Sequence, residues 1–86
     1  MNRAVDFVFR GQLDCDSFIG FVRHRAGRLD LDLRIDDCSK SAVAVHVAGQ
    51  EDLVDMFEMA CSLGPYDCIV LDVSRSESRL TPVRQD

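Results

Sequence analysis

The sequence predicts an α+β fold, a ferredoxin-like βαββαβ sandwich in which a four-stranded antiparallel sheet carries two helices on one face. Four segments alternate apolar with other residues at the period of two that is typical of half-buried strands. Two segments repeat apolar residues at the spacing of an amphipathic helix. The order of these segments folds into the sandwich through two right-handed crossovers.

The first strand and the first helix flank a short loop. Val5, Phe7 and Phe9 alternate with the remaining residues of the strand, and Gly11 ends it. Ser17 is the predicted N-cap of the helix. The apolar stripe of this helix consists of Phe18, Phe21, Val22, Ala26 and Leu29.

A β-hairpin follows, with a polar turn over residues 36–41. The alternating apolar positions of its two strands are Leu31, Leu33, Ile35, Val43, Val45 and Val47. Gly49 ends the second of these strands. The regular alternation indicates that one face of the hairpin is buried.

The second helix begins at Gln50, Glu51 and Asp52, whose two carboxylates lie where the helix dipole favours negative charge, and Gly64-Pro65 stops it. Its predicted apolar stripe is Leu53, Met56, Phe57, Ala60 and Leu63. In the fourth strand the alternating apolar residues are Ile69, Leu71 and Val73. Residues 80–83 predict a short fifth strand at an edge, because Pro82 cannot occupy a central strand.

Length and charge restrict the function. The 86 residues make one domain, residues 1–86, and the net charge is −5. An acidic chain is unsuited to generic binding of nucleic acid or anionic membranes, which needs a basic surface. The strand aromatics also lie in the register expected for the core, whereas RNA-binding domains of this topology expose theirs to stack bases.

The four cysteines are Cys15, Cys38, Cys61 and Cys68, and none forms a C-x-x-C pair. Polar residues near the start interrupt any signal-like apolar run, and no segment has the length of a membrane span. We therefore expect free thiols and a cytoplasmic location. Cys61 and Cys68 are expected to pack in the core as small apolar residues.

The loop between the first strand and the first helix is the expected functional site. A strand, a tight loop and a helix N-terminus together form a common anion site, since backbone N–H groups converge there. The loop residues are Gln12, Leu13, Asp14, Cys15, Asp16 and Ser17. This loop lacks Arg and Lys, so it supplies no side-chain cation for a phosphate.

Several short motifs share one register along the chain. Gly11, Phe18, Phe21 and Val22 match a loop of the form G-R-V-Q-G-V-G-F-R-x-F-V, and Ala26, Leu29 and Leu31 match the A-x-x-L-G-L segment that follows it. Residues 43–49 match V-x-V-x-x-x-G, and residues 57–65 correspond to F-x-x-x-L-x-x-G-P at Phe57, Gly64 and Pro65. In these motifs the chain resembles the acylphosphatase family, whose enzymes hydrolyse the carboxyl-phosphate bond of acyl phosphates.

This resemblance implies where catalysis would occur and why it is expected to fail. In the family, an Arg after the loop Phe binds phosphate, and an Asn at the end of the second strand orients water. The matching positions here are Ile19 and Asp37, while Cys15 and Ser17 replace loop glycines. Loss of a charge-assisted contact and the added loop carboxylates both oppose phosphate binding.

We therefore expect an acylphosphatase-like domain that is impaired or inactive as an enzyme and acts in binding, with no cofactor. One alternative is an active enzyme with a rearranged site, in which Asp37 holds the water and another arginine binds the acyl phosphate. The candidate replacements are Arg10, Arg23 and Arg34. Another alternative is a small regulatory domain that binds a ligand or a metal through Asp14, Asp16, Asp36 and Asp37.

The sheet face opposite the helices predicts a partner surface. The apolar residues assigned to this open face are Val8, Ala44, Ala48, Cys68 and Val70. The face is unusually apolar for a solvated sheet surface, so we expect it to support a homodimer or docking to another protein.

Overall fold

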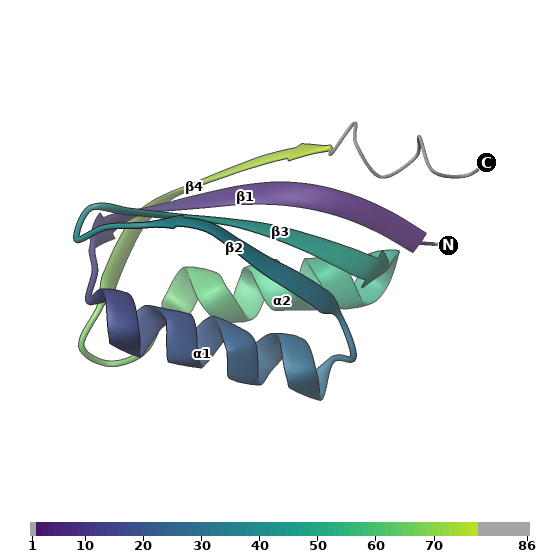
Figure 1. Cartoon of the computed structure of the whole chain (residues 1–86), viewed down its shortest axis with the longest axis horizontal. Coiled ribbons are helices and arrows are strands. Elements are labelled where there is room, and N and C mark those ends of the chain that lie inside the picture. Colours follow the sequence, from purple (N-terminus) through teal and green to yellow (C-terminus); the bar gives the residue numbers. More distant parts are fainter. Residues whose placement is uncertain (1, 78–86) are drawn as a thin grey trace.

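The computed structural model describes residues 2–77 and has the predicted order of elements (Figure 1). They are β1 (Asn2–Gln12), α1 (Cys15–Arg28), β2 (Asp32–Cys38), β3 (Ala42–Gln50), α2 (Glu51–Leu63) and β4 (Ile69–Glu77). The predicted edge strand over residues 80–83 lies outside the described residues. Neither helix is long and apolar enough to cross a membrane, as judged over residues 2–77.

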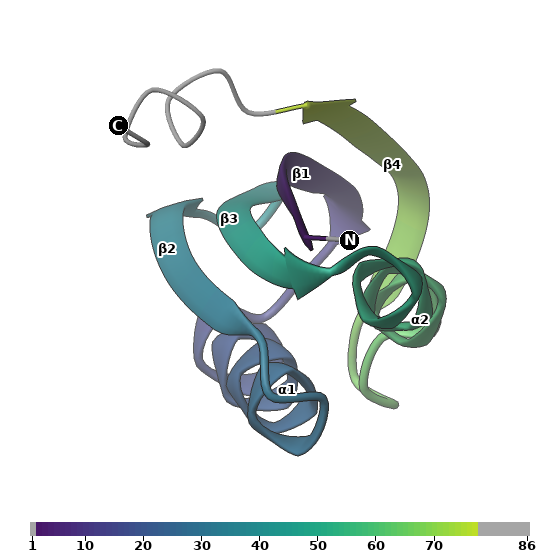
Figure 2. The ribbon, with the colours of Figure 1, turned by 90° about the vertical axis from the view of Figure 1, so that its right-hand side faces the viewer.

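The sheet confirms the predicted fold class. Its strands are antiparallel neighbours in the order β2-β3-β1-β4. Both helices lie on the same face of the sheet, as the end-on view in Figure 2 shows. The loop after β1 and the turn after β2 therefore meet at one end of the sandwich (Figure 1).

The core lies between the sheet and the helices. The predicted alternation is confirmed in β1 and β3, whose inward residues, among them Phe7 and Phe9, are fully buried. The Phe7 ring lies 5.9 Å from that of Phe57 on α2, and the Phe9 ring lies 5.4 Å from that of Phe18 on α1. These tilted aromatic pairs join each helix to the central strand.

The buried face of α2 differs from the predicted stripe by about one residue of rotation. Val54, Phe57 and Cys61 are fully buried, whereas Met56 and Leu63 are 53% and 79% exposed. Burial raises the pKa of the Cys61 thiol to about 12, while the Arg25 charge opposes this rise. Cys61 is therefore a core residue, as predicted, while two residues of the predicted stripe, Met56 and Leu63, face outward.

The predicted register of β4 is also wrong in its first half. An irregularity in the pairing with β1 lets Gly11 oppose Val70 while Arg10 opposes Asp72, so Leu71 is passed over. As a result Cys68 is buried and Val70 packs against the core, whereas Ile69 and Leu71 are exposed. Cys68 and Val70 therefore do not belong to the open face of the sheet.

The open face is more polar than expected. His46 on β3 pairs with Asp6 on β1, with 2.8 Å between the ring Nδ1 and a carboxylate oxygen. Arg34 on β2 lies beside His46 in the same cross-strand row and binds Asp36. A homodimer through this face stays a prediction, resting now on Val8 and the small residues of β3.

The rotation of α2 gives a stability test. We expect Val54→Ala to lower the free energy of unfolding by about 2 kcal/mol, because it removes two buried methyl groups and leaves a cavity. Leu63→Ala should change it by less than about 0.5 kcal/mol, since that side chain is mostly exposed. Urea unfolding of the two variants measures both values. The reverse order would mean that the stripe predicted from the sequence is the buried face.

Candidate functional site

The loop between β1 and α1 is tied by its backbone to the turn between β2 and β3. The Gly11 N–H donates to the Ser41 carbonyl at 3.1 Å, and the Leu13 N–H donates to the Lys40 carbonyl at 2.8 Å. The Leu13 side chain is buried, so the loop is also anchored in the core. Two of the loop N–H groups are thus committed to the protein itself.

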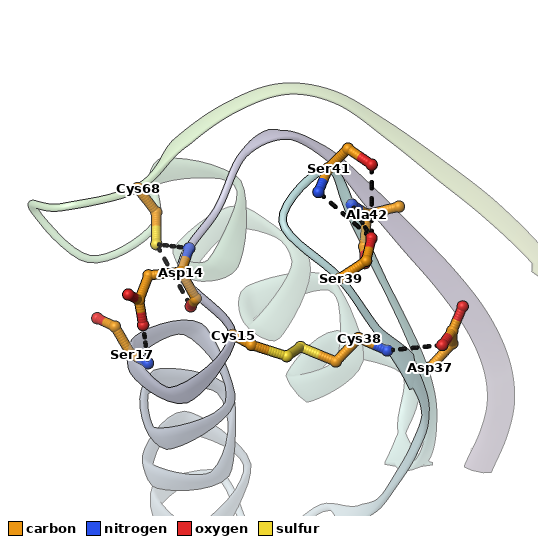
Figure 3. Close-up of a disulfide and its surroundings, with 9 residues drawn as sticks. All are labelled: Asp14, Cys15, Ser17, Asp37, Cys38, Ser39, Ser41, Ala42 and Cys68. Atoms are coloured by element: carbon orange, nitrogen blue, oxygen red, sulfur yellow. Dashed lines mark hydrogen bonds between the residues drawn. A yellow bond between two sulfur atoms is a disulfide. The ribbon is translucent and has the colours of Figure 1, made fainter.

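Asp14 caps α1. Its backbone is extended, and its side-chain Oδ1 accepts from the Ser17 N–H at 3.0 Å (Figure 3). The predicted N-cap, Ser17, is therefore wrong by three residues, and its hydroxyl instead donates to Asp67 at 2.7 Å. The cap places a carboxylate at the end of the helix, where the dipole favours negative charge. A protein carboxylate occupies the position that suits an external anion.

Cys68 completes the inner side of the loop. The Asp14 N–H points to the Cys68 sulfur at 3.3 Å, and the Phe18 N–H donates to the Asp14 carbonyl at 2.8 Å. Cys68 is buried and free, as predicted, and its contact with the loop arises from the shifted register of β4. Most of the backbone donors that a phosphate cradle would use already have acceptors within the protein.

A disulfide joins Cys15, the first residue of α1, to Cys38, the last residue of β2 (Figure 3). Their Cα atoms lie 5.9 Å apart, a usual distance for such a bond. The expectation of free thiols is therefore wrong for this pair. The predicted fold already places the first loop, with Cys15, beside the end of the second strand, with Cys38, so the pairing could have been inferred from it.

The two residues predicted at catalytic positions, Ile19 and Asp37, lie on different elements, α1 and β2. Asp37 lies on the open face opposite Ala44, and its Oδ1 accepts from the N–H of Cys38 at 2.9 Å. Ile19 is half-buried on α1 and contributes no charge. The carboxylate thus binds its own strand, and the Ile19 side chain offers no hydrogen-bond donor or charge.

The arginines proposed as replacements do not line the depression beside the loop. Arg10 lies against Ser74 and Asp72, and Arg34 binds Asp36 at 2.6 Å. Arg23 is exposed on α1. This depression has a volume of about 350 Å³ and is lined by Gly11, Gln12, Leu13, Asp14, Lys40 and Asp67.

Charge in this depression does not favour an anion. Among the residues that line it, Lys40 is the one basic residue, and Asp14 and Asp67 are acidic. Asp16 is exposed on the first turn of the same helix. Across residues 2–77, no three or more acidic, histidine or cysteine side chains gather as a metal-binding group. The acidic residues considered as cation ligands are therefore not brought together as such a site.

Solved structures share this fold. The acylphosphatase from Coxiella burnetii matches with a TM-score of 0.82 and 21% identity over 90% of this chain and 81% of that chain. The acylphosphatase from Bacillus subtilis matches with a TM-score of 0.81 and 24% identity over 92% of this chain and 87% of that chain. Full-length HypF in its phosphate- and nucleotide-bound form matches with a TM-score of 0.81 and 17% identity.

The match to HypF covers 94% of this chain but only 11% of that chain. No protein-family profile matches the sequence, and no curated protein matches it. At these identities the structural likeness establishes the fold alone. The chain therefore has the fold of acylphosphatases, as the sequence motifs indicate.

The disulfide predicts a large response to reduction. We expect TCEP to lower the free energy of unfolding by about 2–4 kcal/mol, because the bond restrains the unfolded chain across a sequence separation of 23. Urea unfolding with and without TCEP measures the difference. The double variant Cys15→Ser, Cys38→Ser should have the lower free energy of unfolding of the reduced protein, both with and without TCEP.

Thiol counting checks the same bond directly. The oxidised protein, unfolded in denaturant, should react at the two free cysteines, Cys61 and Cys68. After reduction all four cysteines should react. Four reactive thiols in protein purified without reductant would contradict the disulfide.

Proposed function

We propose that this chain is a non-catalytic binding domain with the acylphosphatase fold. The observation that carries the proposal is the Asp14 cap, whose carboxylate holds the Ser17 N–H at the N-terminus of α1. An acyl phosphate would have to displace this carboxylate and would meet its charge at close range. Like charges in a partly desolvated site strongly oppose such binding.

The loss of the family's site residues supports the same conclusion. With Ile19 in place of Arg, no guanidinium compensates the charge of the transferring phosphoryl group. Asp37 could still accept a hydrogen bond from water, but a water with no clamped phosphoryl group has nothing to attack. Lys40 is the one cation lining the depression, and two carboxylates there offset its charge. An active enzyme with a rearranged site is therefore the less favoured function.

The disulfide also bears on where such a domain would act. The cytoplasmic prediction relied on free thiols, and Cys15 and Cys38 do not meet that premise. Disulfides persist chiefly in oxidising compartments. A cytoplasmic location stays a prediction, and the disulfide weakens its basis.

Hydrolysis of benzoyl phosphate tests the proposed function. We expect no release of phosphate above the uncatalysed rate, with the Bacillus subtilis acylphosphatase as positive control. Amide NMR spectra during titration with inorganic phosphate should show no saturable shift over residues 12–18. Turnover close to that of the control enzyme, abolished by Asp37→Ala, would overturn the proposal.

Restoring the family's residues tests the role of the cap. We expect the double variant Ile19→Arg, Asp37→Asn to stay without phosphate affinity, because Asp14 still occupies the Ser17 N–H. Adding Asp14→Ala should free this donor and produce phosphate-dependent amide shifts at the start of α1. The matched control adds Asp16→Ala instead, which removes the same charge and leaves the cap in place. Equal gains from both additions would show that net charge, and not the cap, excludes phosphate.

A further inference from the structure

Helix α2 carries a second apolar face that points away from the core. Met56, Met59 and Leu63 are 53%, 70% and 79% exposed. With Phe21 of α1 they line a groove of about 390 Å³ between the two helices, and Ala60 forms part of its wall. Its lining residues belong to α1 and α2 and to Gly64 directly after α2, and Figure 2 shows both helices on one side of the sheet. The groove therefore lies away from the open face of the sheet.

The groove is apolar and carries one positive charge. The Arg25 guanidinium lines it and lies over the Phe21 ring, 5.2 Å from the ring centroid. Arg23 and Arg28, also on α1, are exposed. Within residues 2–77 none of these three arginines forms a salt bridge, whereas Arg3, Arg10, Arg34 and Arg75 all do. Arg25 thus brings a positive charge without a salt-bridge partner to an apolar groove, in a chain whose net charge is −5.

We propose that this groove binds an amphipathic helix of a partner protein that carries acidic residues beside its apolar stripe. The apolar stripe would lie on the two methionines and Leu63, and a carboxylate would pair with Arg25. Methionine side chains are flexible and polarizable, which suits them to accept a helix in a groove. Helices α1 and α2 are each about 20 Å long, so they can support about four turns of a bound helix.

Charge favours an acidic partner over the other occupants. A second copy of this chain docked symmetrically in the groove would bring its own α1 arginines against these arginines. An anionic membrane would also attract Arg25, but its broad surface is suited to a convex apolar face and not to a groove between two helices. An acidic helix satisfies both the apolar lining and the unpaired guanidinium.

This inference rests on the proposed function in one respect only, that the domain acts by binding. The groove and the loop after β1 share no lining residue. Docking and hydrolysis can therefore be measured separately in the same preparation. Hydrolysis together with helix binding would refute the proposed function and leave the docking site intact.

The experiment uses two synthetic fluorescent peptides of about four helical turns. Both carry leucine at the spacing of an amphipathic helix, and they differ only in glutamate or lysine at the flanking positions. Fluorescence anisotropy with the oxidised full chain should show that the acidic peptide binds at least about tenfold more tightly. Shifts of the Met56 and Met59 methyl resonances would locate the bound peptide.

Substitutions on the groove separate apolar from charged contributions. Met59→Gln should weaken the acidic peptide by about tenfold, and Leu71→Gln, an equally exposed change on β4, should leave it unaltered. Arg25→Glu should reverse the preference, so that the lysine peptide binds more tightly. Reversal by a charge swap is not expected from a general loss of folding.

Four outcomes would overturn the proposal. They are no binding of the acidic peptide, equal loss from Met59→Gln and Leu71→Gln, no reversal with Arg25→Glu, and occupation of the groove by something else. If a second copy of the chain occupied the groove, analytical ultracentrifugation would show a dimer that Met59→Gln abolishes. Co-sedimentation with vesicles of phosphatidylserine and phosphatidylcholine, again lost with Met59→Gln, would reveal a membrane as the occupant.

Discussion

The close approach of β1 and β4 at Gly11 is the constraint on which the candidate site depends. A Cβ atom at this position would lie 1.9 Å from the Ile69 carbonyl oxygen, so only glycine fits there. The approach accompanies the irregular pairing that passes over Leu71 and turns Cys68 into the core. The Cys68 sulfur then meets the Asp14 N–H, and Asp14 caps α1. The backbone contact at Gly11 thus places Cys68 against the loop between β1 and α1, where its sulfur accepts the Asp14 N–H.

A second constraint fixes the orientation of α2. Arg75 on β4 binds both Asp55 and Glu58 on the helix, and its guanidinium also lies 5.6 Å from the centroid of Phe7. Holding these two carboxylates toward β4 leaves Phe57 and its neighbours facing the sheet. The methionine side of the helix is consequently turned outward toward α1. The exposed groove follows from a polar interaction on the opposite flank of the helix.

The sequence predicted the elements well because local periodicity alone specifies them. The strands β1 and β3 are central and alternate without interruption, so their buried faces were predicted correctly. The rotation of α2 was not predictable in this way, because the helix is apolar on two faces. Contacts distant in sequence, the Phe57–Phe7 packing and the Arg75 ion pairs, distinguish them. The register predicted for the first half of β4 was wrong for a related reason. A bulge in its pairing with β1 reverses which residues face the core, and the bulge depends on the close approach to Gly11.

The same distinction applies to the candidate site: features set by neighbouring residues were predicted, and features set by contacts between distant segments were not. Its place in the chain follows from a strand, a loop and a helix start, and the lack of Arg and Lys in the loop can be read directly from the sequence. The Asp14 cap and the Cys15–Cys38 bond depend on how separate segments meet, and the sequence analysis missed both. They matter most for function, because together they hold the loop without an anion.

In a phosphate-binding loop the ligand itself satisfies the converging N–H groups. Here a carboxylate, a thiol and neighbouring carbonyls do so instead, and the disulfide adds a covalent link to β2. A loop stabilised in this way has internal partners for its N–H groups, so its shape does not depend on a bound anion.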